Sequence, residues 1–134
     1  MKQLWAPWRL AFVEKVSRLS GCIFCEKPAL KRDDKSFILR RSRHAYVIMN
    51  IYPYNNGHLM VIPYKHVEEL EGLPDATLSE MMVVTKDCCE VLKEAMIPHG
   101  FNIGVNVGDA AGAGIKEHRR YQGCRPRQGR QAFC

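Results

Sequence analysis

Two cysteines, Cys22 and Cys25, form the clearest candidate for a chemical site in this 134-residue sequence. Two thiolates separated by two residues can bind one tetrahedral zinc ion, which then needs two further ligands. A redox-active dithiol is the alternative, but such a pair usually opens a helix after a strand, and the run Glu26-Lys27-Pro28 interrupts that setting. Spacing alone does not choose the remaining zinc ligands. The candidates are the five histidines of the chain, His44, His58, His66, His99 and His118.

A loop of small residues is the second candidate. Residues 108–114 read GDAAGAG and follow shortly after Asn106. Small side chains let a ligand approach the backbone, and the N–H groups of such a loop can hold phosphate oxygens. The loop lacks the Gly-Lys-Ser/Thr sequence of a P-loop, so a plain turn is the alternative interpretation.

The third candidate is the segment over residues 50–66. It combines a strand, an Asn-Gly turn, a second strand and a terminal histidine. This order could present polar groups at one end of a sheet. The alternative is a hairpin whose histidines are merely exposed.

Together these segments resemble the histidine triad (HIT) family, and most closely the bacterial branch named for hydrolysis or phosphorolysis of diadenosine polyphosphates. Five separated segments agree with that family in order and spacing. They are residues 5–9 (WAPWR), 22–25 (CIFC), 50–63 (NIYPYNNGHLMVIP), 66–67 (HV) and 100–118 (GFNIGVNVGDAAGAGIKEH). The resemblance implies an α+β fold, with an antiparallel sheet of about five strands backed by one long helix, and it implies a homodimer.

The resemblance also implies a complete set of zinc ligands. In zinc-bearing members the cysteine pair is joined by the histidine of a Pro-x-x-His element and by the first histidine of the triad. The matching residues here are His66 and His118, so the implied site is Cys22, Cys25, His66 and His118. A closed site of this composition is structural, and it would tie the N-terminal segment, the sheet and the last strand together.

The nucleotide contacts implied by the resemblance fall in two segments. Asn50 matches a residue that binds ribose hydroxyls, Ile51 matches its base-stacking neighbour, and His58 looks like a partner that supports the triad. The α-phosphate is expected at Asn106 and the small-residue loop. The glycines of that loop are Gly108, Gly112 and Gly114. The implied ligand is a nucleotide or a dinucleoside polyphosphate.

The sequence departs from the family at the triad itself. The family motif is His-x-His-x-His, and its middle histidine attacks the α-phosphate to form a covalent nucleotidyl-histidine. The three positions here are His118, Arg120 and Gln122. Glutamine at the third position has a parallel in the transferase and phosphorylase branches, but a guanidinium stays protonated and offers no lone pair to phosphorus. We therefore expect an inactive or very slow product of a HIT hydrolase or transferase gene. The alternative is a non-catalytic, zinc-stabilised nucleotide-binding or sensor module.

One long helix must carry much of the core beneath these sites. Apolar residues at spacings of three and four predict it over residues 75–96. Its expected apolar stripe is Leu78, Met81, Met82, Thr85, Cys88, Cys89, Leu92 and Met96. We expect Asp75 or Thr77 to cap its start, and Pro98 with Gly100 to end it.

Strands surround this helix in the sequence. Runs rich in β-branched and aromatic residues predict strands over residues 36–40, 44–52, 58–63 and 101–107. The Asn-Gly pair before the third run predicts a turn with a positive φ angle. A short helix is expected over residues 10–19.

Charge separates the last sixteen residues from the rest of the chain. The net charge is +6, and residues 119–134 hold five arginines and no acidic residue. This stretch also lacks the apolar alternation of a strand. We therefore expect one HIT-like domain over residues 1–118 with an incomplete last strand, followed by a disordered basic tail. Such a tail could bind nucleic acid non-specifically, but a solvated tail is the simpler interpretation, and we do not expect nucleic acid as a partner.

Location is inferred from what the sequence lacks. It has no run of 18 apolar residues that would span a membrane and no signal-peptide pattern at its N-terminus. We therefore expect a cytoplasmic protein whose six cysteines are thiols or metal ligands rather than disulfides.

Overall fold

The computed structural model describes residues 22–51, 56–67 and 70–105, and the backbone of three short strands nearer the C-terminus. In chain order the elements are α2 (Ile23–Ala29), α3 (Asp33–Ser36), β1 (Ile38–Arg41), β2 (Ala45–Met49), β3 (Leu59–Pro63), the 3-10 turn η1 (Leu70–Gly72), α4 (Asp75–Met96), β4 (Phe101–Asn102), β5 (Gly104–Val105), β6 (Tyr121–Gln122), β7 (Pro126–Arg127) and β8 (Gln131–Phe133). The helix predicted over residues 10–19 lies outside the described residues.

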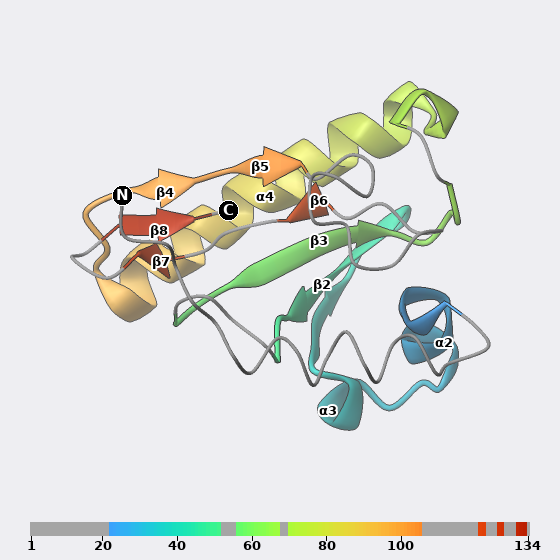
Figure 1. The fold of residues 1–134 in the computed structure, drawn as a ribbon, viewed down its shortest axis with the longest axis horizontal. Helices are drawn as coiled ribbons and strands as arrows, with labels where there is room; N and C mark the ends of the chain where they lie inside the picture. Colours follow the sequence, from blue (N-terminus) through green and yellow to red (C-terminus); the bar gives the residue numbers. More distant parts are fainter. Residues whose placement is uncertain are drawn as a thin grey trace, which may run out of the picture.

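The main sheet has five antiparallel strands in the order β1-β2-β3-β6-β5 (Figure 1). Strands β2 and β3 pair without interruption from Ala45–Pro63 to Met49–Leu59. The register of β1 against β2 shifts between Ile38 and Arg40, which marks a β-bulge. A smaller sheet has the order β4-β8-β7, with β4 and β8 parallel. The predicted antiparallel sheet of about five strands is confirmed.

The central strands are buried on both faces, because successive side chains of a strand point to opposite sides of the sheet. One apolar cluster lies between the sheet and α4. Its members from the strands are Ala45, Val47, Leu59 and Val61. The other cluster lies on the α2 side and contains Phe24, Ile38, Tyr46, Ile48, Met60 and Ile62. Figure 1 shows α4 along one side of the sheet and α2 on the opposite side.

Helix α4 spans Asp75–Met96, the range that the periodicity predicts. Its buried residues are Thr77, Met81, Val84, Thr85, Cys88 and Leu92. The predicted stripe is wrong at two positions, since Met82 and Met96 are 50% and 41% exposed. Val84, which is 1% exposed, belongs to the buried face instead. No helix in the described part of the chain is long and apolar enough to cross a membrane.

The start of α4 differs from the prediction. Pro74 is the N-cap residue and no side chain caps the helix, so Asp75 is the first helical residue rather than the cap. Thr77 points into the core instead. The carboxylate of Glu80 accepts a hydrogen bond from the backbone N–H of His44, which joins α4 to the turn between β1 and β2.

The helix also ends before Gly100. Ile97 adopts the left-handed conformation with φ 48°, and its N–H bonds to the carbonyl of Lys93 at 3.1 Å. Pro98 follows at once and cannot continue the helix. The helix therefore ends just before Pro98, as predicted, but Ile97 rather than Gly100 adopts the left-handed conformation.

The β2–β3 hairpin has the expected positive-φ glycine, since Gly57 has φ 74°. Strand β2 ends at Met49 rather than at residue 52, and the backbone N–H of Asn50 donates to the carbonyl of His58 at 3.0 Å to close the hairpin. In the C-terminal stretch, β6 pairs with β3 and β5. Tyr121 and Gln122, two residues of the predicted tail, thus form a strand of the main sheet where we expected an incomplete last strand. The domain boundary at residue 118 stays a prediction.

Candidate functional site

Helix α2 brings the two cysteines of the motif to one side. Cys22 is its N-cap residue, and its carbonyl accepts hydrogen bonds from the N–H groups of Cys25 and Glu26 at 3.0 and 3.1 Å. This single helical turn places residues i and i+3 on the same face. Phe24, between the cysteines, is 4% exposed and packs into the cluster on the α2 side of the sheet.

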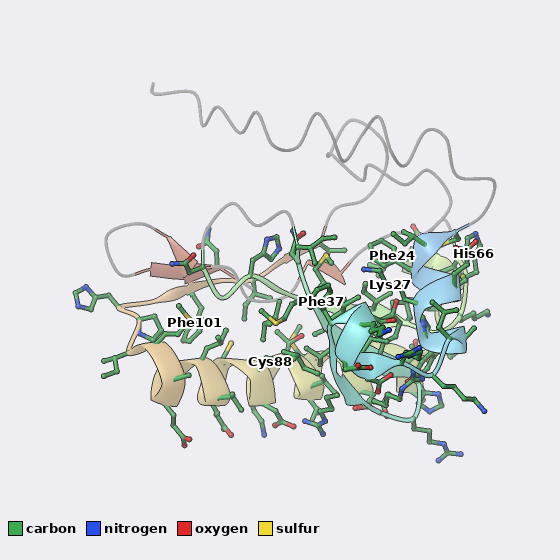
Figure 2. The ribbon with its side chains drawn as sticks, turned by 90° about the horizontal axis from the view of Figure 1, so that it is seen from below. Phe24, Lys27, Phe37, His66, Cys88 and Phe101 are labelled. Carbon is green, nitrogen blue, oxygen red and sulfur yellow. The ribbon has the colours of Figure 1, made fainter. Side chains whose placement is uncertain are left out.

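His66 joins the cysteines from a distant part of the chain. It follows the end of β3 by three residues, and its Nδ1 lies 3.2 Å from the Sγ of Cys25. The ligand atoms of Cys22, Cys25 and His66 all lie within 4.8 Å of one another. Figure 2 shows His66 and Phe24 at the same end of the molecule, beside α2. These three residues could bind a metal ion.

The thiol chemistry favours a metal over redox catalysis. Burial, a hydrogen bond with Cys22 and the charges of Cys22 and Glu26 together raise the pKa of Cys25 to about 11. A reactive redox cysteine needs a lowered pKa, because the thiolate is the nucleophile. In the metal-free chain Cys25 therefore keeps its proton at neutral pH, and a bound cation would displace that proton.

Strands β1 and β2 hold α2 in place through residues that the sequence analysis did not single out. Arg41 forms a two-pronged ion pair with Asp33, with its closest contact at 2.7 Å, and also donates to the carbonyl of Pro28 at 2.9 Å. The hydroxyl of Tyr46 donates to the carbonyl of Phe24 at 2.7 Å. Burial, together with the nearby thiols, raises the pKa of Tyr46 above its ordinary range. The sequence offered two signs of these contacts, namely Pro28 inside the helix and the opposite charges of Arg41 and Asp33.

Asn50 and His58 form a second polar group. The side-chain Nδ2 of Asn50 lies within hydrogen-bond distance of Nδ1 of His58, at 3.0 Å. His58 is 2% exposed, whereas Ile51 beside Asn50 is 46% exposed. The hairpin end therefore offers a positioned carboxamide next to an open apolar side chain.

The two polar groups lie at opposite ends of the β2–β3 pair. The Ala45–Pro63 pair is at the end that leads to His66, and the Met49–Leu59 pair is at the end that leads to Asn50. Five-residue strands separate the two ends by roughly 15 Å. The candidate metal-binding cluster and the Asn50–His58 group are thus distinct, and the paired strands β2 and β3 join them.

Several predicted site residues lie outside the described residues. They are the phosphate-loop residues Asn106, Gly108, Gly112 and Gly114, the fourth zinc ligand His118, and Arg120 at the nucleophile position. The structure brings together three of the four predicted metal ligands, and it pairs two of the three nucleotide residues that it describes.

Comparison with known proteins points to one family. A model of the HIT domain matches residues 31–117. The AP-4-A phosphorylase of Mycobacterium tuberculosis is 37% identical over 126 residues, which cover 88% of this chain and 64% of that protein. The chain therefore spans slightly less than two thirds of the length of this curated relative.

Solved structures agree with this result. The histidine triad nucleotide-binding protein from Candida albicans superposes with a TM-score of 0.66 at 28% identity, covering 81% of this chain and 76% of that chain. A zinc-bound histidine triad family protein from Mycobacterium smegmatis gives a TM-score of 0.63 at 26% identity, with the same coverage.

Proposed function

Because the chain belongs to the HIT domain family, we propose that it is a zinc-stabilised nucleotide-binding protein with impaired activity on dinucleoside polyphosphates. The convergence of Cys22, Cys25 and His66 carries this proposal. Cys25 and His66 are 41 residues apart in the sequence. A shared metal ion explains why exposed His66 lies directly against a thiol.

The donor set fits zinc. Two sulfurs and one imidazole nitrogen suit zinc, whereas magnesium and calcium prefer oxygen ligands. We assign the fourth position to His118. Bound zinc would supply a structural cross-link between α2, the end of β3 and the segment that holds His118. The zinc-bound relative from Mycobacterium smegmatis supports zinc as the metal.

Metal analysis of the purified full chain tests the centre. We expect about one zinc per chain, lost in Cys25→Ala and His66→Ala variants. Cys88→Ala is the matched control, because Cys88 is a buried thiol in the α4 cluster, away from the proposed ligands. Zinc retained in full by both ligand variants would contradict the centre.

We assign nucleotide binding to the opposite end of the β2–β3 pair. The carboxamide of Asn50 is fixed by His58 and is suited to ribose hydroxyls, and exposed Ile51 can pack against a base. Asn106 and the glycines of the following loop, Gly108, Gly112 and Gly114, would receive the phosphates. The AP-4-A phosphorylase relative supports a dinucleoside polyphosphate as the substrate class.

Catalysis is impaired, in this proposal, because Arg120 occupies the position of the attacking histidine. Loss of a covalent nucleophile lowers turnover by about 10⁴-fold or more. Incubation of the chain with diadenosine tetraphosphate, with and without phosphate, tests this through product analysis. Arg120→His should raise turnover. Rapid turnover by the unaltered chain would refute the role assigned to Arg120.

The second candidate is a nucleotide-binding or sensor module without catalysis, and the arginine at the nucleophile position favours it. Titration with AMP or ADP separates the two candidates. Saturable binding without turnover, weakened by Asn50→Ala, supports the module. Failure to bind either nucleotide would exclude it. We also propose a homodimer, which sedimentation of the full chain tests.

A further inference from the structure

A side chain of strand β2 contacts the backbone that separates the two cysteines. Tyr46 is completely buried, and its hydroxyl donates a 2.7 Å hydrogen bond to the carbonyl oxygen of Phe24. Phe24 lies between Cys22 and Cys25 in the first turn of α2. The acceptor therefore belongs to the peptide unit that joins Phe24 to Cys25, within the turn that carries both thiols.

A proline explains why a side chain bonds to this carbonyl. In a regular α-helix the carbonyl of residue i accepts the N–H of residue i+4. For Phe24 that residue is Pro28, which lies inside α2 and has no N–H. Tyr46 thus donates to a carbonyl for which Pro28, at position i+4, has no N–H to offer.

The neighbouring strand adds a second anchor. Arg41 of β1 lies directly opposite Tyr46 of β2, and it donates to the carbonyl of Pro28 at 2.9 Å. The ring of Tyr64 lies 5.3 Å from the ring of Tyr46, measured between centroids, and packs against it. This cross-strand pair therefore holds α2 at two carbonyls, four residues apart, and the packed rings restrict the rotation of Tyr46.

We propose that Tyr46 is a positioning residue for the metal centre. Through the Phe24 carbonyl it fixes the first turn of α2, so that the thiols of Cys22 and Cys25 both face His66. Residues that orient metal ligands without binding the metal typically lower the metal affinity by 10–100-fold when they are removed. This inference rests on the proposed zinc site and extends it to a residue that binds no metal itself.

The test is the zinc affinity of Tyr46→Phe in the full chain, measured by competition with a chromophoric chelator. Thr85→Val is the matched control. The hydroxyl of Thr85 is equally buried and donates a 2.7 Å bond to the carbonyl of Met81, but it lies in α4, on the other side of the sheet. We expect the dissociation constant for zinc to rise about 10-fold in Tyr46→Phe and to stay within twofold of the parent in Thr85→Val.

A rescue experiment separates positioning from general packing. Pro28→Ala restores an N–H at the position that bonds to the Phe24 carbonyl in a regular helix. The double variant Tyr46→Phe/Pro28→Ala should therefore recover most of the lost zinc affinity. Cobalt(II) bound in place of zinc gives an absorption spectrum sensitive to ligand geometry, which should change in Tyr46→Phe and return toward the parent spectrum in the double variant.

Each outcome either supports or refutes the positioning role of Tyr46. Unchanged zinc affinity in Tyr46→Phe, or an equal loss in Thr85→Val, refutes the positioning role while leaving the metal centre intact. A parent chain that binds no zinc refutes the metal centre and the positioning role together. Should Tyr46→Phe alone fail to fold, the double variant decides: recovery of folding and zinc affinity supports the proposal, and no recovery overturns it.

Discussion

Removal of zinc from the full chain should release helix α2 before it affects the sheet. Helix α2 has seven residues, which is too few for a stable helix in water on its own. In the proposed function, zinc would join it to His66, beyond β3, in addition to the bonds from Arg41 and Tyr46. With free zinc at about 100 times its dissociation constant, binding stabilises the folded chain by about 2.7 kcal/mol, which corresponds to roughly 10 °C in Tm for a chain of this size.

Hydrogen exchange with and without a chelator measures where this stability is lost. The amides of Glu26 and Leu30, which bond to carbonyls at the start of α2 and within it, should exchange faster once zinc is removed. The amides of the central β2–β3 pair should keep most of their protection. A Cys88→Ala variant should show the same dependence on zinc. Equal protection of α2 in both conditions, with an unchanged Tm in a chain shown to contain zinc, would refute the reasoning.

Three further predictions concern stability and can be checked by thermal or denaturant unfolding. Met81→Ala should destabilise the chain by about 2–5 kcal/mol because Met81 is 1% exposed, whereas Met82→Ala should change stability by less than about 0.5 kcal/mol because Met82 is 50% exposed; similar losses in both would contradict the assignment of the buried face. Gly57→Ala should cost about 1–2 kcal/mol, since φ at Gly57 is 74° and a Cβ is strained there; a neutral effect would show that the turn adapts. The hydrogen bond from Arg41 lowers the pKa of Asp33 below its ordinary 3.8, so this carboxylate adds stability above pH 3.8 that is lost as the pH falls through the lowered pKa. Asp33→Asn should therefore lower Tm at neutral pH, and its Tm should approach that of the parent as the pH falls below 3.8; a constant difference at all pH values would exclude the ion pair as the cause.

The sequence predicts the elements that bury apolar residues. Helix α4 is found at Asp75–Met96 because an apolar residue recurs every three to four positions. Strands β2 and β3 are found because their runs are apolar on both faces. The buried face of α4 contains Val84 and not the predicted Met82, which periodicity alone could not show. Both residues are apolar, and only the packing against the sheet decides which of them is covered.

Contacts between distant segments could not be derived from periodicity. The position of His66 beside Cys25 depends on how the end of β3 leaves the sheet, and spacing does not encode that path. The bond from Tyr46 to the Phe24 carbonyl joins residues 22 positions apart. The local sign in the sequence was a proline four residues after Phe24, which has no N–H to donate to this carbonyl. The cap of α4 was predicted wrongly for a related reason. No side chain caps this helix, and its first turns are tied instead to a distant turn through the bond from the His44 N–H to the carboxylate of Glu80.

The length, register and charge of β1 affect how readily the molecules associate at high concentration. This strand forms an outer edge of the five-stranded sheet, and an unprotected edge can template the addition of strands from other molecules. Strand β1 has only four residues, its register is broken by the bulge, and Arg40 and Arg41 place charge along it, with Arg40 bonded to Asp87 at 2.7 Å. Growth of a continuous intermolecular sheet from this side is therefore discouraged, and fibril formation at high concentration should not begin at β1.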